Sequence, residues 1–137
     1  GGAPESELAG AIRKFSEKIS GREQLAIQKF AEAIEGIPTA LAENSGADTI
    51  DTIVALRSRH EKGEVWAGLD PISGKVKDME KLNVYEPVSV KKQLIKSASE
   101  AANMILRIDD IIASSKMKAP AMPKTPKSEM PGGESGD

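Results

Sequence analysis

The sequence has no cysteine and few aromatic residues, with one Trp, one Tyr and two Phe among its 137 residues. Without cysteine the chain forms no disulfide, zinc–thiolate site or thiol nucleophile, and this composition is typical of a reducing compartment such as the cytoplasm. No run of about 18 apolar residues occurs, so no stretch of the sequence is predicted to span a membrane. The core has to be built mainly from Ile, Leu, Val and Ala.

No charge of one sign dominates the composition. The chain carries 19 basic and 21 acidic side chains, for a net charge of −2. A nucleic-acid-binding protein would show a clustered basic excess, so we expect no nucleic-acid partner and no membrane partner. The length suits one domain or a piece of a larger one. Because the sequence begins with Gly rather than Met, we expect it to be processed or cut from a longer chain.

Apolar residues at helical spacing predict a mainly α structure. A first helix is expected over residues 6–20, ended by Gly21. A second should begin near Arg22, kink at Pro38 and end at residues 44–46, and a third should be capped by Asp48 or Thr49. The side chains expected to face inward are Leu8, Ile12, Phe15 and Ile19 in the first helix, Ile27, Phe30, Ile34, Ile37 and Leu41 in the second, and Ile50, Ile53, Val54 and Leu56 in the third.

The residue pattern changes from helical to strand-like after Gly63. Residues 64–70 and 74–78 favour short strands, and Pro71 and Gly74 between them predict the turn of a small β-hairpin. A loop over residues 84–87 should precede a long helix over 88–106, and residues 108–112 are predicted to form a short terminal β-strand. Residues 115–137, rich in Pro, Lys and Met, are predicted to be a disordered tail.

Several segments together closely resemble the group II chaperonins, that is, the archaeal thermosome and its eukaryotic cytosolic relatives, with the archaeal branch nearer. The resemblance runs in unbroken order over about residues 1–114. The segments that carry it are Gly1-Gly2-Ala3-Pro4-Glu5, Gly21-Arg22-Glu23-Gln24-Leu25-Ala26-Ile27, Ile37-Pro38, Leu41-Ala42-Glu43-Asn44, His60-Glu61-Lys62-Gly63, Gly74-Lys75-Val76-Lys77-Asp78-Met79, Tyr85-Glu86-Pro87, Ile95-Lys96-Ser97-Ala98-Ser99-Glu100-Ala101-Ala102 and Met104-Ile105-Leu106-Arg107-Ile108-Asp109-Asp110.

This resemblance implies that residues 1–114 are the C-terminal portion of a chaperonin equatorial domain. The implied fold is a helical bundle with a small hairpin beside the nucleotide and a terminal strand that joins a neighbouring subunit. The implied parent is a cytoplasmic, ATP-driven folding machine that acts with ATP/ADP and Mg, assembles as a double ring with other chaperonin subunits, and takes unfolded proteins as clients. The family's tail is often rich in Gly and Met, and residues 115–137 depart from that pattern.

The resemblance also implies binding residues, and each has an ordinary alternative. Gly1 and Gly2 match the end of the family's glycine run beside the nucleotide, or they are an expression scar. Asp70 falls where the family's hairpin meets the adenosine, although an Asp before Pro is also a common turn residue. Glu86 matches an acid that accepts hydrogen bonds from the ribose hydroxyls, or it is a carboxylate at a helix start.

Other conspicuous residues are expected to be structural. His60 has no second ligand at metal spacing and is predicted to lie at the surface or at a helix end. Adjacent residues of a strand face opposite sides, so the pair Asp109-Asp110 is assigned a structural or subunit-contact role. Trp66 is assigned to packing, and Lys91-Lys92 to solvated charge.

The family's phosphate loop, magnesium ligands and catalytic Asp lie outside the matched residues. We therefore predict no catalytic and no metal-binding residue here, and no ATP hydrolysis or client folding by these 137 residues alone. A competing hypothesis is a stand-alone helical interaction module that docks on chaperonin subunits and neither binds nor hydrolyses ATP.

Overall fold

The computed structural model describes the backbone of residues 1–114 and the side chains up to residue 108. It divides the chain into two compact units, one formed by Gly1–Pro87 and one that begins at Val88. The tail predicted over residues 115–137 lies outside the described residues.

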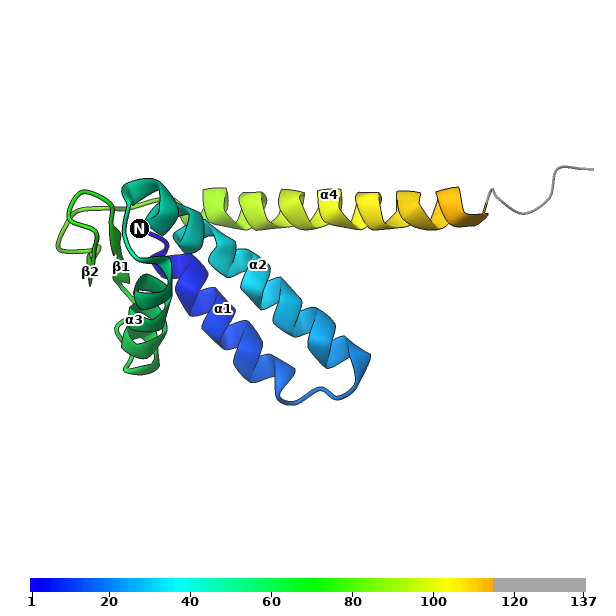
Figure 1. Cartoon of the computed structure of the whole chain (residues 1–137), viewed down its shortest axis with the longest axis horizontal. Helices are drawn as coiled ribbons and strands as arrows, with labels where there is room; N and C mark the ends of the chain where they lie inside the picture. Colours follow the sequence, from blue (N-terminus) through cyan, green and yellow to red (C-terminus); the bar gives the residue numbers. More distant parts are fainter. Residues whose placement is uncertain (115–137) are drawn as a thin grey trace, which may run out of the picture. The chain divides into compact units, whose positions relative to one another are not determined.

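The first unit consists of three helices followed by a β-hairpin. Figure 1 shows α1 and α2 running side by side in opposite directions, with α3 and the hairpin near the end where the chain begins. In chain order the elements are α1 (Ala3–Ser16), α2 (Arg22–Ser45), α3 (Thr49–Glu61), β1 (Ala67–Asp70) and β2 (Lys75–Asp78).

Local capping signals explain the start of α3 and the end of α2. Asp48 is the N-cap of α3, and its side chain accepts a hydrogen bond from the Asp51 N–H at 2.8 Å. Gly46 ends α2 with a φ of 72°, in the left-handed region that glycine adopts easily. The helix α1 begins three residues earlier than predicted, at Ala3, and ends four residues earlier, because the chain leaves it after Ser16 through a turn in which the Lys18 N–H donates to the Phe15 carbonyl. Pro38 lies within α2, which continues past it to Ser45.

The buried contact between α1 and α2 is built from small residues. The fully buried Ala9 of α1 meets Ala31 and Ile34 of α2, with Leu8 and Ile12 packed partly buried beside them. Phe15 and Phe30, predicted to face inward, are instead 54% and 42% exposed. The prediction was wrong there because closely approaching helices place small residues at the contact, so the larger side chains flank it.

The buried face of α3 also differs from the prediction. Leu56 and Thr52, one turn apart, are buried, whereas Ile50 and Val54 are 76% and 60% exposed. These two pairs lie on nearly opposite sides of the helix, since successive residues are 100° apart. Only one side of α3 is therefore covered by the rest of the first unit.

The predicted hairpin is confirmed. The strands β1 and β2 pair antiparallel, with Ala67 opposite Asp78 and Leu69 opposite Val76. The turn closes when the Gly74 N–H donates to the Asp70 carbonyl at 2.9 Å. Leu69 is fully buried, so β1 is the strand that faces the helices.

The second unit, as far as it is described, is the helix α4 (Val88–Ser114). The helix predicted over 88–106 is confirmed, but the terminal β-strand predicted over 108–112 is wrong, because these residues continue α4. A strand needs a neighbouring strand to satisfy its backbone groups, whereas a helix satisfies them internally. Asp109 and Asp110 thus have helical backbone, and the role predicted for their side chains lies outside the described residues. Over the described part of the chain, no helix combines the length and apolarity needed to cross a membrane.

Candidate functional site

The first residue of the chain lies along the outer edge of β1. The Gly1 carbonyl accepts a hydrogen bond from the Leu69 N–H at 2.7 Å. A Cβ added to Gly68 would lie 2.6 Å from Met79 Cγ and 2.9 Å from the Gly1 oxygen, and a Cβ on Gly1 would collide with the Met79 sulfur. We call Gly1, Gly68, Leu69 and Met79 the Met79 junction. Glycine at position 68 allows the backbone of Gly1 to approach closely, whereas a Cβ at position 1 would require the Met79 side chain to move.

The fold favours glycine at position 2 for a separate reason. It precedes α1 with a φ of 75°, and a Cβ there would lie 2.7 Å from the Cβ of Pro38. The N-terminus of α1 is therefore seated directly on α2 at the proline. The glycine pair is thus explained by the fold of this chain, and its predicted contact with a nucleotide stays a prediction.

Asp70 is engaged within its own turn. Its Oδ2 accepts hydrogen bonds from Lys77 Nζ at 2.8 Å and Ser73 Oγ at 2.7 Å, and its Oδ1 accepts one from the Ile72 N–H at 3.0 Å. The hydrogen bond from Lys77, followed by those from Ser73 and Ile72, lowers the pKa of Asp70 from 3.8 to about 2. Asp70 therefore acts as a turn residue here, and its predicted contact with an adenosine is not tested by these bonds.

Glu86 lies exposed in the loop between β2 and α4, next to two anchored residues. The Val84 N–H donates to the Met79 carbonyl at 3.0 Å. The Tyr85 ring meets Trp66 edge to face, with centroids 6.0 Å apart and planes at 85°. Trp66 thus packs against Tyr85, although it remains 41% exposed. Aromatic pairs of this geometry contribute about 0.5–1.5 kcal/mol beyond their buried area, so the loop that carries Glu86 is held beside the start of β1.

The predicted binding residues are therefore only partly gathered. The Met79 side chain lies against Gly1 and β1. The Met79 carbonyl accepts the hydrogen bond from Val84, in the loop that carries Glu86. Gly2 faces Pro38, and the Asp70 carboxylate bonds within the hairpin turn. Sequence reasoning missed Met79, which is 3% exposed, because an isolated methionine after a strand carries no pattern of its own.

His60 was predicted to lie at the surface or at a helix end, and the structure confirms the position at a helix end. It sits in the last turn of α3, but its side chain is 6% exposed. Its Nδ1 lies 2.6 Å from Glu7 Oε2, and its Nε2 lies 2.8 Å from the Ala67 carbonyl oxygen. Because a carbonyl only accepts, Nε2 is the donor of that bond.

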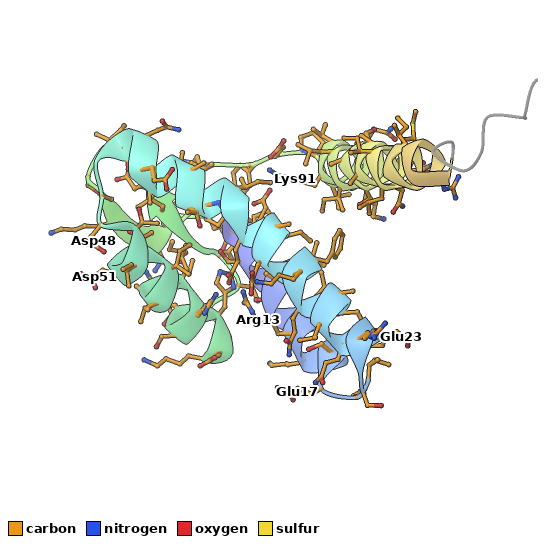
Figure 2. The ribbon with its side chains drawn as sticks, turned by 45° about the vertical axis from the view of Figure 1, so that its right-hand side comes forward. Arg13, Glu17, Glu23, Asp48, Asp51 and Lys91 are labelled. Carbon is orange, nitrogen blue, oxygen red and sulfur yellow. The ribbon has the colours of Figure 1, made fainter. Side chains whose placement is uncertain are left out.

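A buried carboxylate joins the three helices. Glu35 of α2 accepts hydrogen bonds from Arg13 of α1 and from Arg57 of α3, the latter at 2.9 and 2.6 Å. In Figure 2 the side chain of Arg13 lies on the side of α1 toward α3. Burial by itself raises the pKa of Glu35, but the hydrogen bonds from Arg57 and Arg13 outweigh it and lower the pKa from 4.5 to about 2.

The charged side chains of the first unit can be sorted by what they contact. Across residues 1–108, whose side chains are described, no group of three or more His, Asp or Glu residues is placed to hold a metal ion. Glu86 is an exposed carboxylate on an anchored loop, suited to accept hydrogen bonds from a hydroxylated ligand. The carboxylates of Glu35 and Asp70 accept hydrogen bonds from basic side chains of this chain.

Comparisons with known proteins agree on one family. The model of the TCP-1/cpn60 chaperonin family matches residues 1–116. Thermosome subunit 1 of Haloferax volcanii is 59% identical over 114 residues, which cover 83% of this chain and 20% of that protein. The thermosome subunit of Methanocaldococcus jannaschii is 53% identical over 139 residues, covering 100% of this chain and 24% of that protein.

A solved structure gives the same result for the fold. The open-state monomer of a group II chaperonin from Methanococcoides burtonii superposes with a TM-score of 0.76 at 52% identity, covering 78% of this chain and 27% of that one. The chain thus spans between 20% and 27% of the length of these relatives. Because the family model matches well over half of the sequence, the chain belongs to the TCP-1/cpn60 chaperonin family.

Proposed function

We propose that residues 1–114 are the C-terminal portion of the equatorial, nucleotide-binding domain of a thermosome-type group II chaperonin, an ATP-dependent machine that assists protein folding. The observation that carries the proposal is the match over residues 1–116, together with 52% identity to a group II chaperonin of the same fold. The relatives described above are chaperonin subunits and lend no support to a stand-alone interaction module.

Within that machine, the first unit supplies one wall of the nucleotide site. Glu86 supports this role best, because its exposed carboxylate stands on a loop held by Val84 and Tyr85. A carboxylate accepts two hydrogen bonds, which suits the vicinal hydroxyls of a ribose. Gly1, Gly2 and Asp70 stay candidates beside it. Magnesium and the reacting phosphates would be held by residues outside this sequence, so these residues contribute to binding rather than to hydrolysis.

The same proposal includes the partners and the location. We expect other chaperonin subunits as ring partners, unfolded proteins as clients and a cytoplasmic location. Large exposed apolar side chains support subunit or domain contacts, since Ile50 and Val54 of α3 and Leu25 of α2 are each at least 60% exposed.

Glu86→Gln tests the nucleotide assignment. In the assembled chaperonin that contains this sequence, we expect the Kd for ATP to rise about 10- to 100-fold, because a charge-assisted hydrogen bond contributes about 1.5–3 kcal/mol and glutamine keeps only one acceptor oxygen. The measurement is equilibrium titration with ATP and with 2′-deoxy-ATP. The preference for ATP over the deoxy form should shrink in the variant.

Glu80→Gln is the matched control, since Glu80 is an exposed acid in the turn that precedes the same loop. Its Kd for ATP should stay within twofold of the unaltered protein. An unchanged Kd and an unchanged preference for the 2′-hydroxyl in Glu86→Gln would remove Glu86 from the site.

A further inference from the structure

Two consecutive residues at the end of α3 hold both strands of the hairpin. His60 Nε2 donates to the carbonyl of Ala67 in β1 at 2.8 Å. Arg59 Nη1 donates to the carbonyl of Val76 in β2 at 2.8 Å, and its Nε donates to Glu64 at 2.6 Å. We call Arg59 and His60 the hairpin clamp.

The register shows why these two carbonyls are available. Ala67 pairs with Asp78, Leu69 pairs with Val76, and the Met79 N–H donates to the Trp66 carbonyl at 2.9 Å. In an antiparallel pair the backbone groups of alternate residues point away from the partner strand. Ala67 and Val76 are such residues, so their carbonyls lie on the two outer edges of the hairpin. Arg59 and His60 therefore hold the hairpin by hydrogen bonds at both of its outer edges.

A hairpin of two four-residue strands is only marginally stable by itself. Its orientation consequently depends on the groups that bond to its outer edges. On β1 these are His60 at Ala67 and the Gly1 carbonyl at Leu69. The other ring nitrogen of His60 lies beside Glu7 of α1, so one imidazole spans from α1 to β1.

The clamped strand end is also the end that supports the candidate site. Ala67 lies between Trp66, whose ring contacts Tyr85 beside Glu86, and Gly68 of the Met79 junction. A shift of β1 at Ala67 would therefore move both the loop of Glu86 and the Gly1 contact. Ala67 is 1% exposed, so no water is available to replace a lost hydrogen bond at its carbonyl without rearrangement.

We propose that Arg59 and His60 are positioning residues for nucleotide binding, which act by fixing the hairpin and, through Trp66 and Tyr85, the loop of Glu86. The proposal rests on the proposed function of the first unit as a nucleotide-site wall. Neither residue is assigned a contact with the nucleotide.

Two substitutions at His60 separate the two ring nitrogens. His60→Gln places an amide donor near the position of Nε2 and keeps the bond to Ala67, whereas His60→Asn places one near Nδ1 and keeps only the contact with Glu7. In the assembled chaperonin that contains this sequence, we expect His60→Asn to raise the Kd and KM for ATP about 3–10-fold, the equivalent of one hydrogen bond. The kcat at saturating ATP should stay within twofold, and His60→Gln should bind ATP within twofold of the unaltered protein.

A purely structural role would affect both variants alike, so equal weakening by His60→Asn and His60→Gln, or no weakening by either, overturns the proposal. If His60→Asn does not assemble, Arg59→Gln carries the test at the second strand, and an unchanged Kd for ATP there overturns it. Different results would contradict the nucleotide-site proposal and the clamp proposal. Loss of the Glu86→Gln effect contradicts the nucleotide-site assignment, whereas a retained Glu86→Gln effect with no difference between the His60 variants contradicts the clamp alone.

Discussion

Replacing Glu35 with glutamine is expected to lower the free energy of unfolding by about 2–4 kcal/mol. Removing one partner of a buried ion pair costs about 3–5 kcal/mol, because the other charge is left without compensation. The Glu35 side chain is 7% exposed, but its partners Arg13 and Arg57 are 28% and 47% exposed. Water therefore recovers part of the loss, which places the expected value toward the lower end. Urea denaturation followed by far-UV circular dichroism measures it.

The effect should depend on pH in a defined direction. The folded-state pKa of Glu35 is lowered from 4.5 to about 2, so its ionised form stabilises the fold above about pH 4.5. That contribution is lost as the pH falls from 4.5 toward 2. The stability difference between the unaltered chain and Glu35→Gln should therefore shrink over this window, and a difference that stays constant would contradict the assignment.

Glu32→Gln is the matched control one turn away on α2. Glu32 is 54% exposed and pairs with Lys29 at 2.7 Å. Exposed pairs of this kind contribute about 0–1 kcal/mol, so the substitution should change stability by less than about 0.5 kcal/mol. Equal effects of the Glu32 and Glu35 substitutions would mean that the three-helix ion pair adds no more than a surface contact.

Replacing Gly2 with alanine is expected to lower the free energy of unfolding by about 2–4 kcal/mol. A residue with a Cβ in left-handed backbone costs about 1–2 kcal/mol. The added Cβ would also lie 2.7 Å from the Cβ of Pro38, and overpacking of this kind costs about 1–3 kcal/mol. The N-terminus of α1 would have to move away from α2. The same urea denaturation measures the change.

Two other glycines separate these contributions. Gly46 has a φ of 72° and nothing within 4 Å of an added Cβ, so Gly46→Ala reports the backbone cost alone. Gly10 lies inside α1, also with open space around it, and Gly10→Ala should stabilise the helix by about 0.5–1 kcal/mol. If Gly2→Ala lowers the free energy of unfolding no more than Gly46→Ala does, the close contact with Pro38 adds nothing to the cost of the substitution.

Features governed by local backbone chemistry were predictable from the sequence. Pro71 and Gly74 predicted the hairpin, Asp48 predicted the start of α3, and residues 44–46 predicted the end of α2. Turns and caps depend on the φ angles and side-chain acceptors of a few adjacent residues, so the information lies in the residues themselves. The family resemblance was equally accessible, because it is a property of the residue order.

The site was predictable only in part. Glu86 was named as a candidate through the resemblance, and the hairpin followed from its turn residues, but the Met79 junction and the two contacts of His60 were not predicted. Each of these joins residues separated by many positions, such as Gly1 with Leu69 or Glu7 with His60. No local pattern marks such a pair.

The sequence by itself determined that three helices, a hairpin and a long helix follow one another in this order, and which family the chain belongs to. Only the tertiary structure decided that Ala9 and Ala31, rather than Phe15 and Phe30, make the α1–α2 contact, and that Glu35 is buried between two arginines. It also decided that residues 108–112 extend α4 instead of forming a strand. The physical reason is that secondary structure follows local dihedral preference, whereas the choice of a buried face, an ion-pair partner or a strand neighbour depends on which surface lies opposite.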